Sequence, residues 1–123
     1  MNWSGFAAIL LGLAVALGAF GAHGLKDRLD AYSMGIWEKA VFYHFVHALG
    51  LLVVSFGNHR LSPAANAWVS WLLVAGIVLF CGSLYALALS GVKTLGAVTP
   101  LGGLAFIAAW LVLAGALFRG GVR

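Results

Sequence analysis

Charged side chains are scarce in this chain of 123 residues. Only 8% of its residues are charged, against about 25% in ordinary soluble domains, whereas 63% are hydrophobic and the mean hydropathy is +1.05. Such a composition excludes an ordinary soluble domain, whose surface needs much more charge. The chain is therefore expected to be an integral membrane protein.

Acidic residues and cysteine are the rarest reactive types. Three acids stand against seven Lys and Arg, but no basic stripe is interleaved with aromatics, so we expect no nucleic acid partner and contact with lipid headgroups instead. Cys81 has no partner within the chain, which excludes an intrachain disulfide. The chain has no GxSxG or HExxH motif and no paired carboxylates, and an enzyme is not expected.

Four apolar segments have the length of about 20 residues that a helix needs to cross the hydrocarbon core. The sequence therefore predicts one all-α domain over residues 1–123, an antiparallel bundle of four transmembrane helices. The first segment is treated as a retained span rather than a signal peptide, because no Lys or Arg precedes it. The four predicted spans are residues 3–23, 39–57, 66–90 and 100–119.

The helix ends carry recognisable signals. Ser62-Pro63 and Thr99-Pro100 each offer an N-cap followed by proline in the first turn, and Gly24 and Gly91 can end the preceding helices. The connection between the first two spans, "LKDRLDAYSMGIWEKA", has apolar residues at helical spacing. It is either a short amphipathic helix in the membrane interface or an ordered loop.

Four spans place both termini on the side of Arg60. The basic residues then divide into Arg60, Arg119 and Arg123 on one side and Lys26, Arg28, Lys39 and Lys93 on the other. This balance does not fix the orientation under the positive-inside rule, and it is also what a protein inserted in both orientations would show.

Rows of small residues let helices approach closely in lipid. Ser4, Ala8, Gly12 and Ala16 form such a row in the first span. The row serves either packing within the chain or an interface between copies, and we expect a homo-oligomer, a dimer or a trimer.

Uncommon polar residues converge on one leaflet. In an antiparallel bundle the side of the Lys26 and Lys93 loops holds a set that we predict to line one ligand-binding pocket. His44 is expected either at the margin of this pocket or facing a neighbouring helix. Ionisable residues inside a membrane are costly and are functional candidates. The predicted pocket residues are His23, Tyr43, His47, Tyr85 and Thr99.

Each of these residues also has a structural interpretation. His23 can cap a helix C-terminus, the tyrosines can belong to the interfacial aromatic belt, and buried histidines can make structural hydrogen bonds. His44, His47 and Cys81 lie at comparable depths and are weak metal candidates, because a closed zinc site needs four ligands. No cofactor is predicted, with metal or haem kept as an alternative.

Four stretches in this order, "GAFGAHGL", "YHFVHALGLL", "GSLYALALSG" and "TPLGGLAFIAAW", resemble the domain of unknown function 423 family. These are small proteins of the bacterial inner membrane, related to eukaryotic transmembrane protein 256. Ala109 departs from the family pattern, where glycine is expected, and His44 belongs to it less securely than His47. The resemblance singles out Gly18, Gly21, His23, Tyr43, His47, Ser83, Tyr85, Thr99, Pro100, Gly102, Gly103 and Trp110.

The resemblance implies fold and location but no activity. Gly18, Gly21, Gly102 and Gly103 are expected to allow close helix packing. The leading hypothesis is a membrane-embedded binding or scaffold protein whose polar pocket in one leaflet takes a lipid headgroup, a small metabolite or a partner helix. The alternatives are a small oligomeric transporter or channel that uses intramembrane histidines, and a metal or haem carrier.

Overall fold

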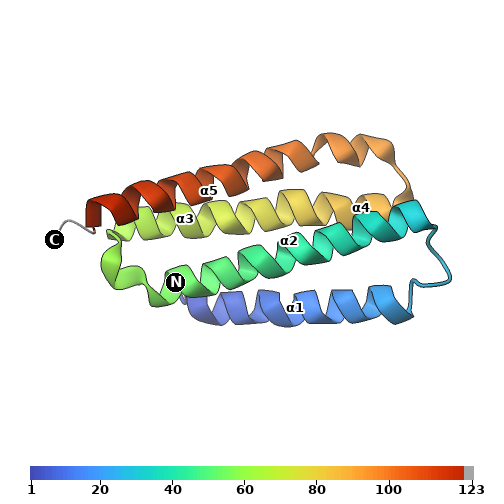
Figure 1. The fold of residues 1–123 in the computed structure, drawn as a ribbon, viewed down its shortest axis with the longest axis horizontal. Helices are drawn as coiled ribbons and strands as arrows, with labels where there is room; N and C mark the ends of the chain where they lie inside the picture. The colour runs from blue at the N-terminus through green and yellow to red at the C-terminus, as the bar shows by residue number, and fades with distance from the viewer. Residues whose placement is uncertain (121–123) are drawn as a thin grey trace.

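The computed structural model describes residues 1–120, which form four helical segments of membrane-spanning length (Figure 1). The predicted all-α, four-span bundle is confirmed, and residues 1–120 contain no strand. Short 3₁₀ turns connect the second span to the third and the third to the fourth. The elements are α1 (Trp3–His23), α2 (Ala31–Phe56), α3 (Pro63–Gly76), a π-helical turn (Ile77–Cys81), α4 (Gly82–Ser90) and α5 (Thr99–Gly120).

Three helices begin at a residue whose side-chain oxygen accepts an N–H group of the first turn. Pro63 follows one of these caps, as predicted, and Gly91 ends α4 in the left-handed conformation, with φ of 73°. Thr99 differs from its predicted role, because it is the first residue of α5 and its hydroxyl pairs with Ser83. The three capping residues are Asn2, Asp30 and Ser62, which accept from Gly5, Ser33 and Ala65.

The connection between α1 and α2 is shorter than the sequence suggested. Residues 24–30 form turns, and the helix that starts at Ala31 continues without a break to Phe56. The predicted amphipathic segment is thus divided between a turn and the beginning of α2, because Asp30 caps a helix that nothing downstream interrupts. At 26 residues, α2 exceeds what the hydrocarbon core requires.

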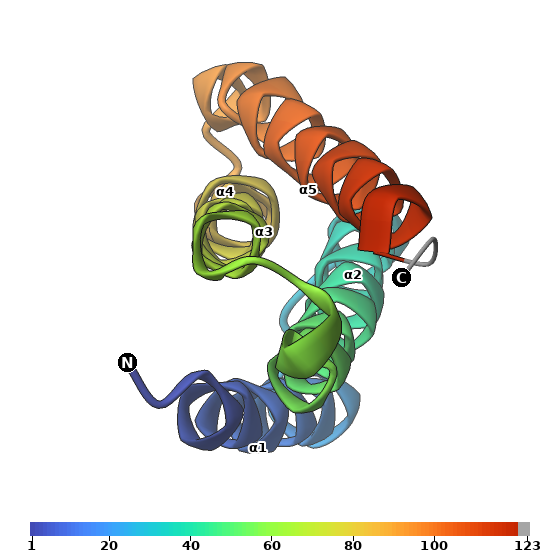
Figure 2. The same ribbon diagram turned by 90° about the vertical axis from the view of Figure 1, so that its left-hand side faces the viewer.

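Successive spans run antiparallel, with the N-terminus and the end of α5 at the end that holds the Arg60 turn (Figure 1). We call this the terminal end and the opposite one the loop end. Seen along the bundle, α1 and α5 are the outer members, and α2 and α3–α4 lie between them (Figure 2). Accordingly, α1 packs mainly on α2, whereas α5 packs mainly on α3 and the π-helical turn.

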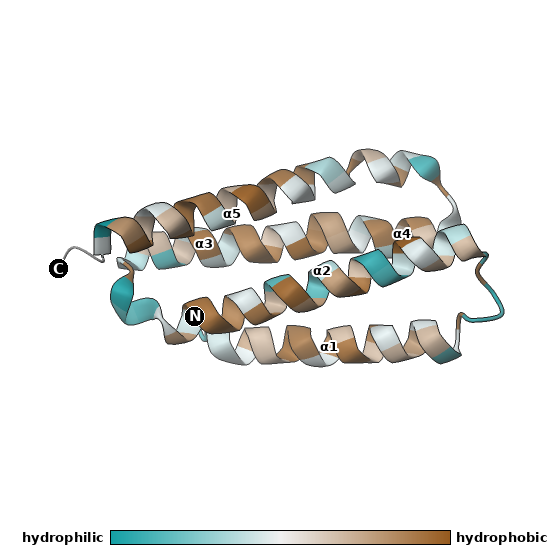
Figure 3. Cartoon of the chain, in the orientation of Figure 1, coloured by the Kyte–Doolittle hydropathy of each residue, from teal (hydrophilic) through white to brown (hydrophobic). Residues whose placement is uncertain are grey.

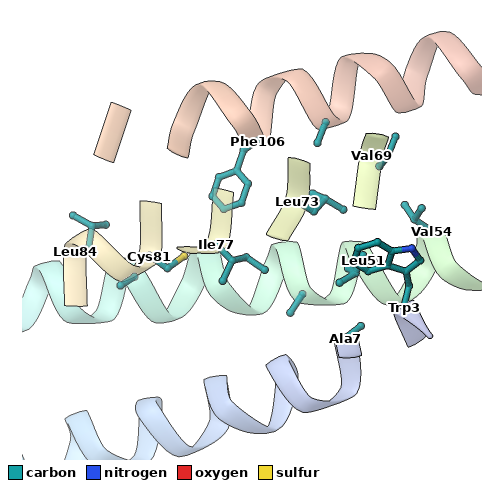
Figure 4. Close-up of a cluster of buried hydrophobic side chains, with 13 residues drawn as sticks. Trp3, Ala7, Leu51, Val54, Val69, Leu73, Ile77, Cys81, Leu84 and Phe106 are labelled. Carbon is teal, nitrogen blue, oxygen red and sulfur yellow. The ribbon is translucent and has the colours of Figure 1, made fainter. Parts of the chain in front are cut away.

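The buried core runs along the bundle between α2, α3–α4 and α5, and Trp3 and Ala7 of α1 join it at the terminal end (Figure 4). The most hydrophilic residues gather toward the two ends of the bundle, and brown apolar residues recur along all four spans (Figure 3). About 17% of the residues in the most apolar part of α1 are buried, against 39% in Pro63–Ser90. The first span is therefore the least buried of the four.

The π-helical turn interrupts the third span where α5 comes closest. The amide of Gly82 donates to the carbonyl of Ile77, five residues back, in place of the α-helical bond to the fourth. A Cβ at Gly102 would collide with the backbone of Phe80 inside this turn. No sequence signal predicted the turn.

Candidate functional site

His44 lies at the centre of the helix contacts and faces the neighbouring α4. Its side chain is 1% exposed, and its Nδ1 atom lies 2.9 Å from the hydroxyl of Tyr85 on α4, while its Nε2 atom makes no hydrogen bond of good geometry. Tyr85 is therefore the side-chain partner of His44. Ala40, His44 and Ala48 follow each other at four-residue spacing along the buried face of α2, which explains the central position.

His47 faces α5 instead. Its Nδ1–H donates to the carbonyl of Tyr43, one turn earlier, at 2.8 Å, so this nitrogen carries the proton. The imidazole stacks on the ring of Phe106 with 3.5 Å between centroids and an interplanar angle of 12°, and it lies parallel to the Tyr43 ring. Tyr43 and His47 are thus brought together, as part of an aromatic contact between α2 and α5.

The structure does not bring His23 to this pair. His23 is exposed at the end of α1, beyond Gly21, which packs against Trp37. His47 lies ten residues beyond Trp37 in the other direction, a distance of about 15 Å along α2. The pocket that would join the two histidines remains a prediction from sequence.

Thr99 completes a separate contact. Its hydroxyl lies 2.6 Å from that of Ser83, which also donates to the carbonyl of Phe80 at the π-helical turn. This pair fixes the start of α5 against α4. Thr99 therefore holds two helices together and makes no hydrogen bond with the buried histidines.

The three weak metal candidates have different neighbours. The imidazole of His44 pairs with Tyr85, that of His47 stacks on Phe106, and Cys81 is buried in the core beside α2 (Figure 4). Within residues 1–120, no group of three or more His, Cys, Asp or Glu side chains is arranged to hold a metal ion.

Gly21 in "GAFGAHGL" leaves room for the indole ring of Trp37. A Cβ at Gly21 would collide with the ring of Trp37, whose Nε1–H donates to the carbonyl of Leu17 at 2.9 Å. Trp37 is 2% exposed and ties α2 to the backbone of α1. Gly18 is less crowded, because a Cβ there would meet only Val41, at 3.4 Å. Gly103 has still more room, with the Phe80 ring 3.8 Å away.

A groove of about 520 Å³ opens between α1 and α2 at the loop end. Its walls are mostly apolar, and its charged lining residues are Lys26 and Glu38. The sequence did not predict this groove, because it does not show which residues of α2 face Gly18 and Gly21. The lining residues are Gly18, Gly21, Ala22, Lys26, Met34, Trp37, Glu38, Val41, Phe42 and Phe45.

The chain has relatives among known bacterial membrane proteins but none among solved structures. Residues 17–103 match the family described as "Protein of unknown function (DUF423)". The chain is 55% identical over 101 residues to a UPF0382 membrane protein of Staphylococcus epidermidis, covering 82% of each chain. It is 50% identical over 102 residues to the UPF0382 membrane protein YwdK of Bacillus subtilis, covering 82% of this chain and 83% of that one. No solved structure matches.

Proposed function

This chain belongs to the DUF423 family of bacterial membrane proteins, and from that premise we propose that it binds a phospholipid in the groove between α1 and α2. It is an integral protein of the bacterial inner membrane, built from four spanning helices. The observation that carries the proposal is an apolar groove with one cation and one anion among its lining residues.

The position of the groove suits a ligand that comes from the bilayer. Ala22 and Phe42 are exposed lining residues, so an acyl chain can enter sideways from the surrounding lipid. Trp37 closes the inner wall and is fixed by its bond to Leu17. Apolar walls with a few placed polar groups are typical of sites for small amphiphiles.

The two charged residues favour a zwitterionic headgroup. Lys26 follows the end of α1 and Glu38 lies in the third turn of α2, so both belong to the loop end, where headgroups lie. Lys26 is suited to a phosphate and Glu38 to an ammonium group. A phospholipid of the phosphatidylethanolamine type carries both.

Native mass spectrometry of the protein in mild detergent tests the proposal. A Leu side chain at Gly18 would extend into the groove, so Gly18→Leu should release lipid that the unchanged protein retains. Ala19→Leu is the matched control, because it adds a similar side chain at an exposed position that does not line the groove. Equal lipid retention by both variants would contradict the proposal.

The headgroup assignment has its own test. Glu38→Gln should lower the retention of phosphatidylethanolamine relative to phosphatidylglycerol, because the ammonium loses its carboxylate. Lys26→Gln should weaken the retention of both lipids. Lys93→Gln, in the other loop of the same end, should change neither.

A further inference from the structure

A second cavity, of about 430 Å³, lies at the terminal end and has the opposite character to the groove. It is formed where the Arg60 turn and the start of α3 meet the last turn of α5. His59, Arg60 and Arg119 are among its lining residues. We infer that this cavity binds a phosphate group, carried either by inorganic phosphate or by the headgroup of a phospholipid.

The acidic side chains lie far from this cavity. All three of them, Asp27, Asp30 and Glu38, belong to the α1–α2 connection or the first turns of α2, at the loop end. Arg60 and Arg119 therefore have no carboxylate side chain near them. An anionic ligand is the partner that their charges favour.

The helix dipoles do not give the cavity a net positive charge. The cavity lies at the start of α3, a positive helix end, and also at the last turn of α5, a negative one. The two contributions oppose each other. The charge that remains comes from the guanidinium groups, which present a planar fork of donors suited to phosphate oxygens.

Close backbone packing between α5 and the Arg60 turn brings Arg60 and Arg119 to the same cavity. A Cβ at Gly120 would lie only 2.8 Å from the carbonyl oxygen of Arg60, so the end of α5 approaches the Arg60 turn more closely than other residues allow. Ser62 fixes the start of α3 by accepting the N–H of Ala65 at 3.1 Å. Arg60 and Arg119 thus line one cavity although they come from distant parts of the chain.

The experiment measures binding to the full-length protein in a phosphate-free detergent. One arm titrates inorganic phosphate by calorimetry. The other measures retention of short-chain phosphatidylglycerol by native mass spectrometry in the Gly18→Leu variant, whose groove is filled, with diacylglycerol as the phosphate-free lipid. Binding in the first arm identifies a soluble phosphate as a ligand, and binding in the second arm alone identifies a headgroup. Binding in neither arm overturns the inference.

Variants then locate the site. Arg60→Gln and Arg119→Gln should each weaken binding by about tenfold, because each removes a charge-assisted hydrogen-bonding fork. Lys93→Gln removes the same charge at the loop end and should leave binding unchanged, so an equal loss in that variant overturns the inference. Arg119→Lys, which keeps the charge, should retain part of the binding and guards against a folding defect.

The result is separable from the proposed function. Gly18→Leu fills the groove at the other end of the bundle and should leave phosphate binding unchanged. Either binding proposal can therefore be refuted without affecting the other.

Discussion

The Nδ1 atom of His44 and the hydroxyl oxygen of Tyr85 lie 2.9 Å apart and join α2 to α4 inside the bundle. The other ring nitrogen of His44 makes no hydrogen bond of good geometry. The bond to Tyr85 is therefore the main hydrogen bond of a nearly fully buried imidazole, and its loss should be costly.

Tyr85→Phe should destabilise the protein by about 1 to 3 kcal/mol, because it removes the side-chain hydrogen-bond partner of the buried His44 imidazole. Thermal unfolding followed by tryptophan fluorescence measures the change. Tyr32→Phe is the control, since Tyr32 is 75% exposed. Equal melting temperatures for the two variants would show that the His44 bond contributes nothing.

His47→Ala should lower stability by about 2 kcal/mol, because it removes the ring that stacks on Phe106 and leaves a gap between α2 and α5. His59→Ala lies in the exposed Arg60 turn and should have little effect. The comparison uses the same unfolding assay. A larger loss in His59→Ala would contradict the stacking argument.

Gly21→Ala should cost about 1 to 3 kcal/mol, because the added methyl displaces the rigid indole of Trp37 and breaks its bond to Leu17. Gly12→Ala is the matched control in the same helix, where a Cβ would meet no atom within 4 Å. It should be neutral or slightly stabilising, since alanine favours helix more than glycine does. Similar losses in both variants would rule out a specific role for Gly21.

Gly12→Leu should shift the distribution of oligomers if copies associate through α1. Ala8, Gly12 and Ala16 are exposed on α1, which is the least buried of the four spans. Sedimentation in detergent measures the distribution, with Gly35→Leu as a control at an exposed glycine of α2. A monomer at every detergent and lipid ratio would refute the expected dimer or trimer.

Asp30→Asn should flatten the loss of stability at acidic pH. The hydrogen bond from the Ser33 backbone N–H lowers the pKa of Asp30 below its ordinary value of 3.8. A carboxyl group whose pKa is lowered by folding stabilises the protein above its unfolded pKa, and this contribution disappears as the pH falls through the folded pKa. Asparagine also caps helices but does not titrate.

Melting temperatures of the two proteins between about pH 2 and pH 6 test this. Parallel curves would show that the cap contributes no pH dependence. The rest of the chain is identical in the two proteins, so the difference between the curves isolates Asp30.

Hydropathy alone predicted the number of spans, because each apolar run is as long as the membrane is thick. The first span, residues 3–23, coincides with α1. The helix that contains the second predicted span begins at Ala31, before residue 39, because hydrogen bonding carries α2 through a polar stretch that a hydropathy criterion rejects.

The candidate site was less predictable, since the sequence gives the depth of a residue but not the direction in which it points. Depth brought Tyr85 and His44 to a similar level, and the two side chains are hydrogen-bonded. It could not show that Tyr85 meets His44, or that Trp37 occupies the space beside Gly21. Those contacts depend on how each helix is rotated about its axis.

The π-helical turn has a consequence for the permitted length of the chain. Each residue of a helix rotates everything after it by about 100°, and the wide turn at Ile77–Cys81 accommodates one residue more than regular α-helix would. Deleting a single residue there would restore a regular helix and keep Tyr85 facing His44 and Ser83 facing Thr99, whereas a deletion in the regular part of the span would rotate both residues away by about 100°. The turn is therefore the place in the third span where the loss of one residue disturbs the packing least.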